Sequence, residues 1–292
     1  MPYLNGSGMD LYYEVAGKGP PLIFSHGLGG SCESVREIVS GLPAKVVLYD
    51  NRGHGQSHAR LDELRPTDEP EMSFRTMSND VARLLDHLGI ERAFVGGVSM
   101  GSGVALSFGL RLPYRVLGLI LSRPAWLDRP HPPNLEFAGI LAPLWEQNSA
   151  AEALRRFVQT PYYEHLKAVY PLSASSLLAT VESSDPQRLK VAYRAMAVST
   201  PMWSLADLSA IAAPTLVIGT RNDPIHPAEI AERWAEAIPG ARLQTIPPKL
   251  DDPEGHLREF HRCVNEFLSR SSGEQPADQT TTERTRLQNH SK

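Results

Sequence analysis

The chain has 292 residues, a formal charge of -4 at neutral pH, 24 prolines and two cysteines. Its 29 basic side chains do not outnumber the 33 acidic ones. The composition therefore does not favour nucleic acid, whose binding needs a basic surface that displaces counterions from phosphates. No apolar run reaches the ~18 residues of a membrane span, and the N-terminal segment lacks the charged and apolar regions of a signal peptide. We expect a cytoplasmic protein with reduced thiols.

Alternating strands and helices are predicted up to about residue 123, because short apolar runs there alternate with amphipathic segments. This alternation is typical of a parallel sheet covered by helices. A helix is expected over residues 74–88, where apolar side chains recur at three and four residues. The expected strands of this part cover residues 11–15, 21–25, 46–49, 93–96 and 116–121.

The pattern changes after residue 123, where four prolines fall within ten residues. The stretch that follows has helical periodicity and no strand-like run, so residues 124–206 are expected to form a helical cap inserted into the sheet domain. Residues 271–292 are rich in Thr, Gln, Glu, Arg and Ser, which predicts a disordered tail.

The strand pattern returns after the insertion, at residues 215–219 and 242–246, with helices expected over 227–238 and 256–268. Residues 1–123 and 207–270 are therefore expected to form a single α/β core.

The first chemical motif is Gly97-Val98-Ser99-Met100-Gly101, which matches the G-x-S-x-G nucleophile elbow. In an elbow the serine occupies a sharp turn between a strand and a helix, and side chains two residues away on either side would collide with backbone. The strand expected before Ser99 and the helix expected after it supply that context. The alternative is a glycine-rich turn that happens to contain a serine.

A second glycine-rich segment, His26-Gly27-Leu28-Gly29-Gly30, directly follows an expected strand. Such a loop lets a backbone N–H point into a site, where it can form half of an oxyanion hole. A third segment, residues 49–57, combines glycines with charged side chains. We interpret it as a structural loop, including His54.

With these motifs in this order, residues 5–270 resemble the α/β-hydrolase fold superfamily, in particular its cap-bearing, serine esterase and lactonase-like branch. The resemblance implies a mostly parallel central sheet flanked by helices, with an inserted helical cap. It also implies a catalytic triad in the order serine, acid, histidine. Asp223 follows the strand expected at 215–219, and His256 follows the strand expected at 242–246, so they are the expected acid and histidine.

Other residues compete for these two roles. Asp128 follows the strand that ends at residue 121, a position that some members of the superfamily use for the acid. Asp251 and Asp252 belong to the loop before His256 and are expected to solvate it. His226 and His261 match the expected Gly-His loop position less well than His256 does.

The resemblance implies acyl transfer through Ser99, with His256 taking its proton and Asp223 orienting the imidazole. The backbone N–H groups of Leu28 and Met100 would hold the oxyanion. No metal or cofactor is expected, and the partner would be a small carboxylic ester or lactone. Carbon–carbon bond hydrolysis, acyl transfer to an alcohol or peroxide, and a receptor-like binding function stay open, as does a homo-oligomer.

Aromatic side chains are frequent in the expected cap. Some of them could line an apolar pocket above Ser99, and they could equally pack the cap helices together. The pocket residues that we expect are Trp126, Trp145 and Trp203.

Overall fold

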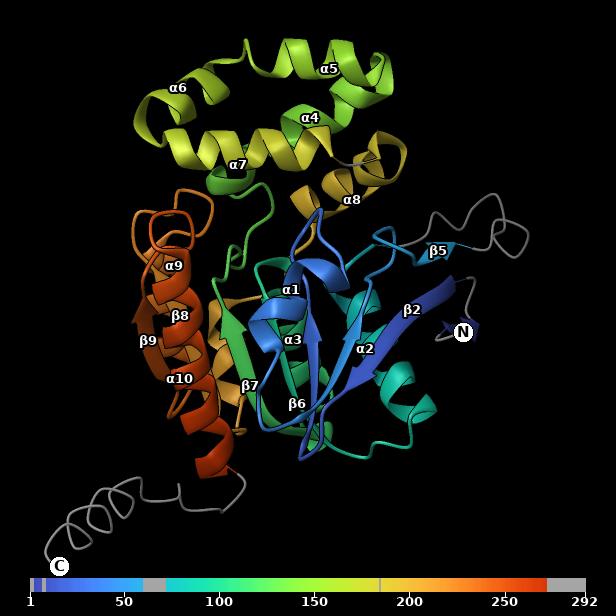
Figure 1. Cartoon of the computed structure of the whole chain (residues 1–292), viewed down its shortest axis with the longest axis vertical. Coiled ribbons are helices and arrows are strands. Elements are labelled where there is room, and N and C mark those ends of the chain that lie inside the picture. Colours follow the sequence, from blue (N-terminus) through green and yellow to red (C-terminus); the bar gives the residue numbers. More distant parts are fainter. Residues whose placement is uncertain (1–2, 7–8, 60–71, 184, 272–292) are drawn as a thin grey trace, which may run out of the picture.

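A nine-stranded sheet forms the centre of the computed structural model, which describes residues 3–6, 9–59, 72–183 and 185–271 (Figure 1). Its order is β1-β2-β4-β3-β6-β7-β8-β9, with β5 paired to β2. All pairs from β4 to β9 are parallel, and β1, β2 and β5 pair antiparallel. The strands are β1 (Tyr3–Gly6), β2 (Met9–Ala16), β3 (Pro21–Ser25), β4 (Lys45–Tyr49), β5 (His58–Ala59), β6 (Ala93–Val98), β7 (Val116–Ser122), β8 (Thr215–Thr220) and β9 (Arg242–Ile246).

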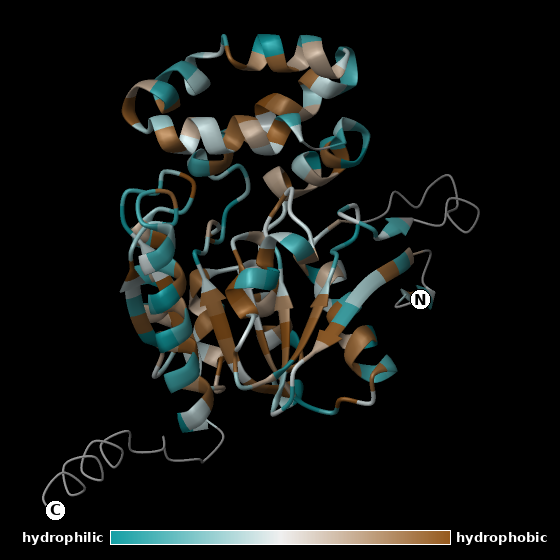
Figure 2. Ribbon diagram, in the orientation of Figure 1, coloured by the Kyte–Doolittle hydropathy of each residue, from teal (hydrophilic) through white to brown (hydrophobic). Residues whose placement is uncertain are grey.

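Helices cover both faces of this sheet and divide its interior into two apolar clusters. Helices α1 (Cys32–Val39) and α10 (Pro253–Ser271) contribute to the cluster on one face. Helices α2 (Phe74–His87), α3 (Met100–Arg111) and α9 (Ala228–Ala237) contribute to the other. The strands are mostly hydrophobic, whereas these helices also carry hydrophilic residues (Figure 2). The predicted α/β class with a mostly parallel sheet is confirmed.

Five further helices lie between β7 and β8 in sequence, within the segment 124–206, which we call the cap. They sit together beyond the carboxyl ends of the strands (Figure 1). The cap helices are α4 (Glu136–Gln147), α5 (Ala150–Phe157), α6 (Pro161–Val169), α7 (Pro171–Glu182) and α8 (Pro186–Val198). Short 3-10 helices occur at Pro113–Arg115, Pro133–Leu135 and Leu205–Ala210.

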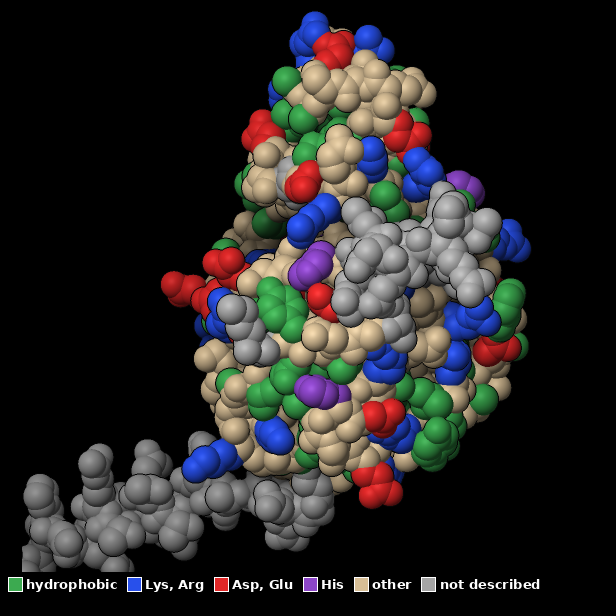
Figure 3. All heavy atoms as spheres, turned by 90° about the vertical axis from the view of Figure 1, so that its right-hand side faces the viewer, with side chains coloured by type: hydrophobic (Ala, Val, Ile, Leu, Met, Phe, Trp, Pro, Cys, Tyr) green, Lys and Arg blue, Asp and Glu red, His purple; other side chains and the backbone are tan. Residues whose placement is uncertain are grey.

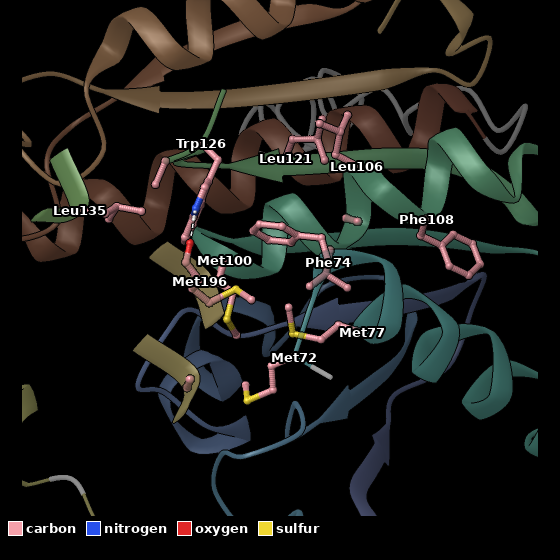
Figure 4. Close-up of a cluster of buried hydrophobic side chains, with 14 of the residues drawn as sticks. Met72, Phe74, Met77, Met100, Leu106, Phe108, Leu121, Trp126, Leu135 and Met196 are labelled. Atoms are coloured by element: carbon pink, nitrogen blue, oxygen red, sulfur yellow. Dashed lines mark hydrogen bonds between the residues drawn. The ribbon is translucent and has the colours of Figure 1, made fainter. Parts of the chain in front are cut away.

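The cap is joined to the core by packing around Trp126 (Figure 4). Trp126 is fully buried, and its Nε1 donates a hydrogen bond to the carbonyl of Met196 on α8, at 3.1 Å. Its ring meets Phe74 of α2 edge to face, with centroids 5.2 Å apart. One apolar cluster therefore runs without a break from the sheet domain into the cap.

Strands β1 and β5 and helix α1 are short and were not predicted from the sequence. The last helix was predicted to begin at residue 256, and this was wrong, because α10 begins at Pro253. Asp252 precedes that helix, and its Oδ1 accepts a hydrogen bond from Gly255 N at 2.8 Å, which is an N-terminal cap. An aspartate followed by proline is the sequence signal for such a start. The predicted tail, apart from Ser271, lies outside the described residues.

Candidate active site

Ser99 lies between β6 and α3 in a backbone conformation that side chains rarely adopt, with φ 57° and ψ -117°. A Cβ on Gly97 would come 2.8 Å from Gly101 Cα, and a Cβ on Gly101 would come 2.8 Å from His26 O. Both positions therefore require glycine for close backbone approach. The backbone N–H of Ser99 donates to Ser122 O on β7 at 2.9 Å, which fixes the turn to the sheet.

Met100, the residue after the serine, holds the elbow in place through its buried side chain. The Met100 side chain is fully buried among sulfur and aromatic side chains (Figure 4). Met100 is the first residue of α3, and the N–H groups of a first helical turn have no partner within the helix. The elbow therefore presents this N–H beside Ser99 while the side chain holds the turn in place.

The loop after β3 passes directly over Ser99. A Cβ on Gly27 would lie 3.3 Å from the serine Cβ and 3.9 Å from its Oγ. The loop is held by Gly30 N, which donates to Gly27 O at 3.0 Å, and by His26. Leu28 is half-buried and packs against the larger apolar cluster.

His26 is fully buried, and its hydrogen bonds hold this loop in its conformation. Its Nδ1 donates to Gly27 O at 2.7 Å, and its Nε2 accepts from Asn51 N at 2.9 Å. Burial lowers its pKa to about 4, so the ring stays neutral. His54, in the neighbouring segment, donates from Nδ1 to Arg52 O at 3.0 Å. The hydrogen bonds of both rings fit structural roles.

Asp223 follows β8, as expected, and its carboxylate is well supplied with donors. Oδ1 accepts from the backbone N–H groups of Ile225 and His226, both at 3.1 Å. Oδ2 lies 2.8 Å from His226 Nδ1 and 3.6 Å from Arg123 Nη1. Burial opposes ionisation, but the contacts with His226 and Arg123 hold the pKa of Asp223 well below its usual range.

His256 is 2 % exposed and lies in the first turn of α10. Its Nδ1 donates to Pro247 O at 2.8 Å. Burial, with the positive charges of Arg123 and Lys249, lowers the pKa of His256 to about 4. Within the described residues, no hydrogen bond joins His256 to Asp223 or to Ser99. The fold thus brings the three predicted triad residues to the same end of the sheet, but the contact of the acid is with His226.

The competing candidates have other contacts. Asp128 Oδ2 accepts from Leu205 N at 3.2 Å, Asp252 caps α10, and Asp251 is exposed. His261 contacts Ile38 O through Nε2 at 3.1 Å, on α1.

Two residues near the site were missed or set aside by the sequence analysis. His226 was set aside because it matches the expected Gly-His loop position less well than His256, although its place three residues after Asp223 lets its ring reach the carboxylate. Arg123 was missed, although it directly follows a strand whose carboxyl end meets the elbow. Arg123 has φ 46° and a side chain that is 16 % exposed.

Several buried polar atoms at this end of the sheet have no hydrogen-bond partner among the described residues. They belong to side chains that end β7 or β8 or follow β7, β8 or β9. The atoms are Ser122 Oγ, Arg123 Nε, Thr220 Oγ1, His226 Nε2 and His256 Nε2. Buried polar groups in native proteins are nearly always paired, so these five atoms could meet a polar ligand or water. Six further such atoms among the described residues, including Tyr49 Oη and Asn51 Oδ1, lie outside this set.

A cavity of about 380 Å³ opens between this region and the start of α7. Its charged and polar walls include Arg123, Asn222, Asp223 and Lys249. Ser99 is not among its lining residues. A second cavity, of about 460 Å³, lies between residues 29–34 and the α7–α8 connection.

The three expected pocket tryptophans have different environments. Trp126 packs between cap and core, as described above. Trp145 is 3 % exposed and packs on Tyr193, with centroids 5.2 Å apart. Trp203 is 92 % exposed, so the expectation that it lines a pocket does not hold: a side chain surrounded by solvent does not enclose a ligand.

Over the described residues, no helix has the length and apolarity to cross a membrane, and no three His, Cys, Asp or Glu side chains are grouped to hold a metal ion. Acidic and basic side chains are interspersed on the face shown in Figure 3. This face therefore shows no basic stripe of the kind that binds nucleic acid.

Residues 20–252 match the family model described as the alpha/beta hydrolase fold. The chain belongs to the α/β hydrolase family. A relative from Azorhizobium caulinodans, whose name describes a carbamate hydrolase, RutD, is 27% identical over 84% of this chain and 89% of its own length. The 2-hydroxy-6-oxo-6-phenylhexa-2,4-dienoate hydrolase of Comamonas testosteroni is 30% identical over 88% and 91%, respectively.

Among α/β hydrolases of known structure, a thermophilic esterase from Thermogutta terrifontis, with malate bound, superposes with a TM-score of 0.69. It is 25% identical, and the alignment covers 92% of this chain and 97% of the esterase. The family predicted from the three motifs is confirmed. The names of these relatives describe hydrolases that act on more than one kind of bond.

Proposed function

We propose that this α/β hydrolase cleaves a small carboxylic ester or lactone through an acyl-enzyme on Ser99. The observation that carries the proposal is the elbow: a serine at positive φ, held by two glycines that tolerate no side chain, with the Gly27 loop against its Oγ. Strain of this kind persists where the surrounding structure imposes it, and it concentrates at active sites.

The chemistry follows from this geometry. Ser99 Oγ attacks the carbonyl carbon, and its proton passes to a neutral imidazole. The N–H groups of Leu28 and Met100 stabilise the oxyanion, where one donor contributes about 3 to 4 kcal/mol in comparable sites. The imidazole then protonates the leaving group, and water releases the acid by the reverse sequence of proton transfers.

Two histidines compete for the role of base. His256 has the position in the chain order that the family predicts, and its Nδ1–H is oriented by Pro247 O. His226 has the contact with Asp223 that a triad acid makes. Both have an Nε2 without a protein partner among the described residues, as a base requires. We retain His256 as the predicted base and treat His226 as the alternative that the contact of Asp223 favours.

The same acyl-enzyme chemistry serves other bonds. The relatives named above are called a carbamate hydrolase, a dienoate hydrolase and an esterase, so carbamate and carbon–carbon bonds are alternatives to the ester. Transfer of the acyl group to an alcohol or peroxide, and slow turnover in a receptor-like protein, also stay open. Product analysis with added methanol or hydrogen peroxide distinguishes transfer from hydrolysis.

The test uses p-nitrophenyl acetate with the intact protein and Ser99→Ala. We expect Ser99→Ala to lose at least ~10³-fold in kcat/KM and to lose the acetyl adduct that mass spectrometry detects on the Ser99 peptide. Full activity in Ser99→Ala would refute the nucleophile. His256→Ala and His226→Ala, compared in the same assay, assign the base: the variant that loses adduct formation lacks it, and His261→Ala serves as the control.

A further inference from the structure

The cavity of about 380 Å³ combines a charged interior with an apolar rim. Three exposed aliphatic side chains line it, namely Val169, Leu172 and Leu250, which are 51%, 52% and 41% exposed. Pockets of this size take small organic molecules, with a few polar groups fixing their orientation. The occupant that suits these walls has an apolar part toward the rim and a polar group toward the sheet.

Arg123 is the polar group at the sheet end of the cavity. Its Nε is buried and has no hydrogen-bond partner in the described part of the chain. Its closest acidic atom is Asp223 Oδ2, at 3.6 Å from Nη1, which is too long for a hydrogen bond. The Asp223 oxygens already accept from Ile225 N, His226 N and the His226 ring. The guanidinium therefore has one ion-pair partner, Asp223, and a buried Nε donor without a partner among the described residues.

The backbone of Arg123 supports a role beyond structure. Its φ of 46° is one of four positive values among the described residues other than glycine, and Ser99 is another. A conformation of this kind costs about 1–3 kcal/mol and tends to occur at functional sites. The strained turn directs the chain from β7 into the cap and leaves the side chain against the cavity.

The other charges of the cavity leave room for an anion. Lys249 lines it and forms no ion pair with a described residue; burial and the Arg123 charge lower its pKa. The acidic members are Asp223, which already accepts three hydrogen bonds, and Asp251. Asp251 and Lys249 are both exposed, so solvent screens both of their charges, and Arg123 is the less exposed of the two cations.

Ser99 does not line the cavity, but the backbone links the two. Ser122 O accepts the hydrogen bond of Ser99 N at 2.9 Å, and Arg123, which lines the cavity, is the next residue, about 3.8 Å along the chain. The backbone of Arg123 therefore lies near the turn that holds Ser99.

We propose that Arg123 binds a carboxylate of the substrate, so that the ester or lactone hydrolysed at Ser99 carries an anionic group. This inference rests on the proposed hydrolase function and names its substrate class. Planar, two-point hydrogen bonding makes arginine suited to carboxylates. Lys249 adds charge at the cavity entrance without fixing the geometry.

The competing role for Arg123 is to position Asp223 alone. Two esters separate the roles: p-nitrophenyl hydrogen glutarate carries a carboxylate, and p-nitrophenyl pentanoate has a similar length without one. We expect the unmodified protein to prefer the charged ester. Arg123→Gln should lower kcat/KM for the charged ester roughly 10- to 100-fold more than for the neutral ester, beyond any loss that both esters share through Asp223. Arg221→Gln, which removes an exposed charge from the same loop region, should change neither.

An equal loss for both esters in Arg123→Gln would overturn the proposal, since it would assign Arg123 to Asp223. Absence of a preference in the unmodified protein would overturn it as well. Calorimetric binding of glutarate to Ser99→Ala, with and without Arg123→Gln, measures the anion site without turnover. If neither ester is hydrolysed but glutarate binds only when Arg123 is present, the hydrolase function fails and the anion site stands. Equal glutarate affinity in both variants would refute the anion site.

Discussion

The two sides of the candidate site are built differently. On the nucleophile side, which comprises residues 26–30 and 97–101, close backbone contacts and paired polar groups fix every turn. On the acid–base side, which comprises Arg123, residues 222–226 and residues 247–256, several buried polar atoms have no partner among the described residues.

This difference fits the proposed function. In that proposal the oxyanion donors would be in place before the reaction, because preorganised dipoles stabilise charge without reorganisation. The groups proposed to bind the substrate or exchange protons would instead keep donors and acceptors free. Side chains added at the glycines of the nucleophile side should therefore cost stability, and changes on the acid–base side should cost function first.

The largest effect on stability is expected for Gly101→Ala. The new methyl group would overlap the backbone carbonyls of Ser25 and His26, and backbone has little room to move. We expect a loss of roughly 3 kcal/mol or more in the free energy of unfolding, beyond ordinary overpacking, measured by urea denaturation. Gly139→Ala is the matched control: that glycine lies in α4 with no atom near its added Cβ, so the change should stabilise by about 0.5–1 kcal/mol. Similar results for the two variants would contradict the close packing of the elbow.

Acid should destabilise the protein through the buried histidines. Burial lowers the pKa of His26 to about 4 from 6.5, so between these pH values the unfolded chain binds a proton that the folded chain does not. Stability then falls as pH decreases from about 6.5 to 4, by about 3 kcal/mol for this group, since one pKa unit corresponds to about 1.4 kcal/mol.

Urea midpoints from pH 8 to pH 4 measure this effect. His26→Gln should show a shallower dependence, whereas the same change at the exposed His165 should leave it unaltered. A slope that is identical in His26→Gln and the unmodified protein would show that His26 is not the group responsible.

Ser99→Gly is expected to increase stability, by less than Gly101→Ala decreases it. Glycine adopts the φ and ψ of this position without steric cost, so removal of the side chain should release roughly 1–3 kcal/mol of strain while activity is lost. Ser99→Ala retains a Cβ and should gain little. Thermal unfolding of the two variants tests the point, and equal melting temperatures would mean that the elbow stores no strain.

The smallest effect concerns the junction of cap and core. Trp126→Phe removes the hydrogen bond to Met196 O, and we expect a loss of about 1 kcal/mol. Trp203→Phe, at an exposed position, should cost nothing measurable. Equal effects of the two changes in urea unfolding would contradict the role of Trp126 as the anchor of the cap.

Much of the nucleophile side was predictable from sequence because its determinants are local. A strand, a glycine two residues before Ser99, a glycine two residues after it and a helix are contiguous in the chain. The strands predicted from short apolar runs, the helix predicted over residues 74–88 from its helical period and the α/β class also followed from local patterns. The assignments of catalytic roles to Ser99, Leu28, Met100, Asp223 and His256 stay predictions.

The tertiary structure alone decided the partners of the acid–base side. Asp223 contacts His226 and Arg123, and these contacts depend on how three strand ends converge and on the rotamers that packing allows. The start of α10 at Pro253 puts His256 in a helix. Trp203, which the composition of the cap had suggested as a pocket residue, is surrounded by solvent. Local sequence determined the elbow because backbone sterics act over a few residues. The choice of partner for a buried charge is made between segments distant in the chain, so only the folded structure fixes it.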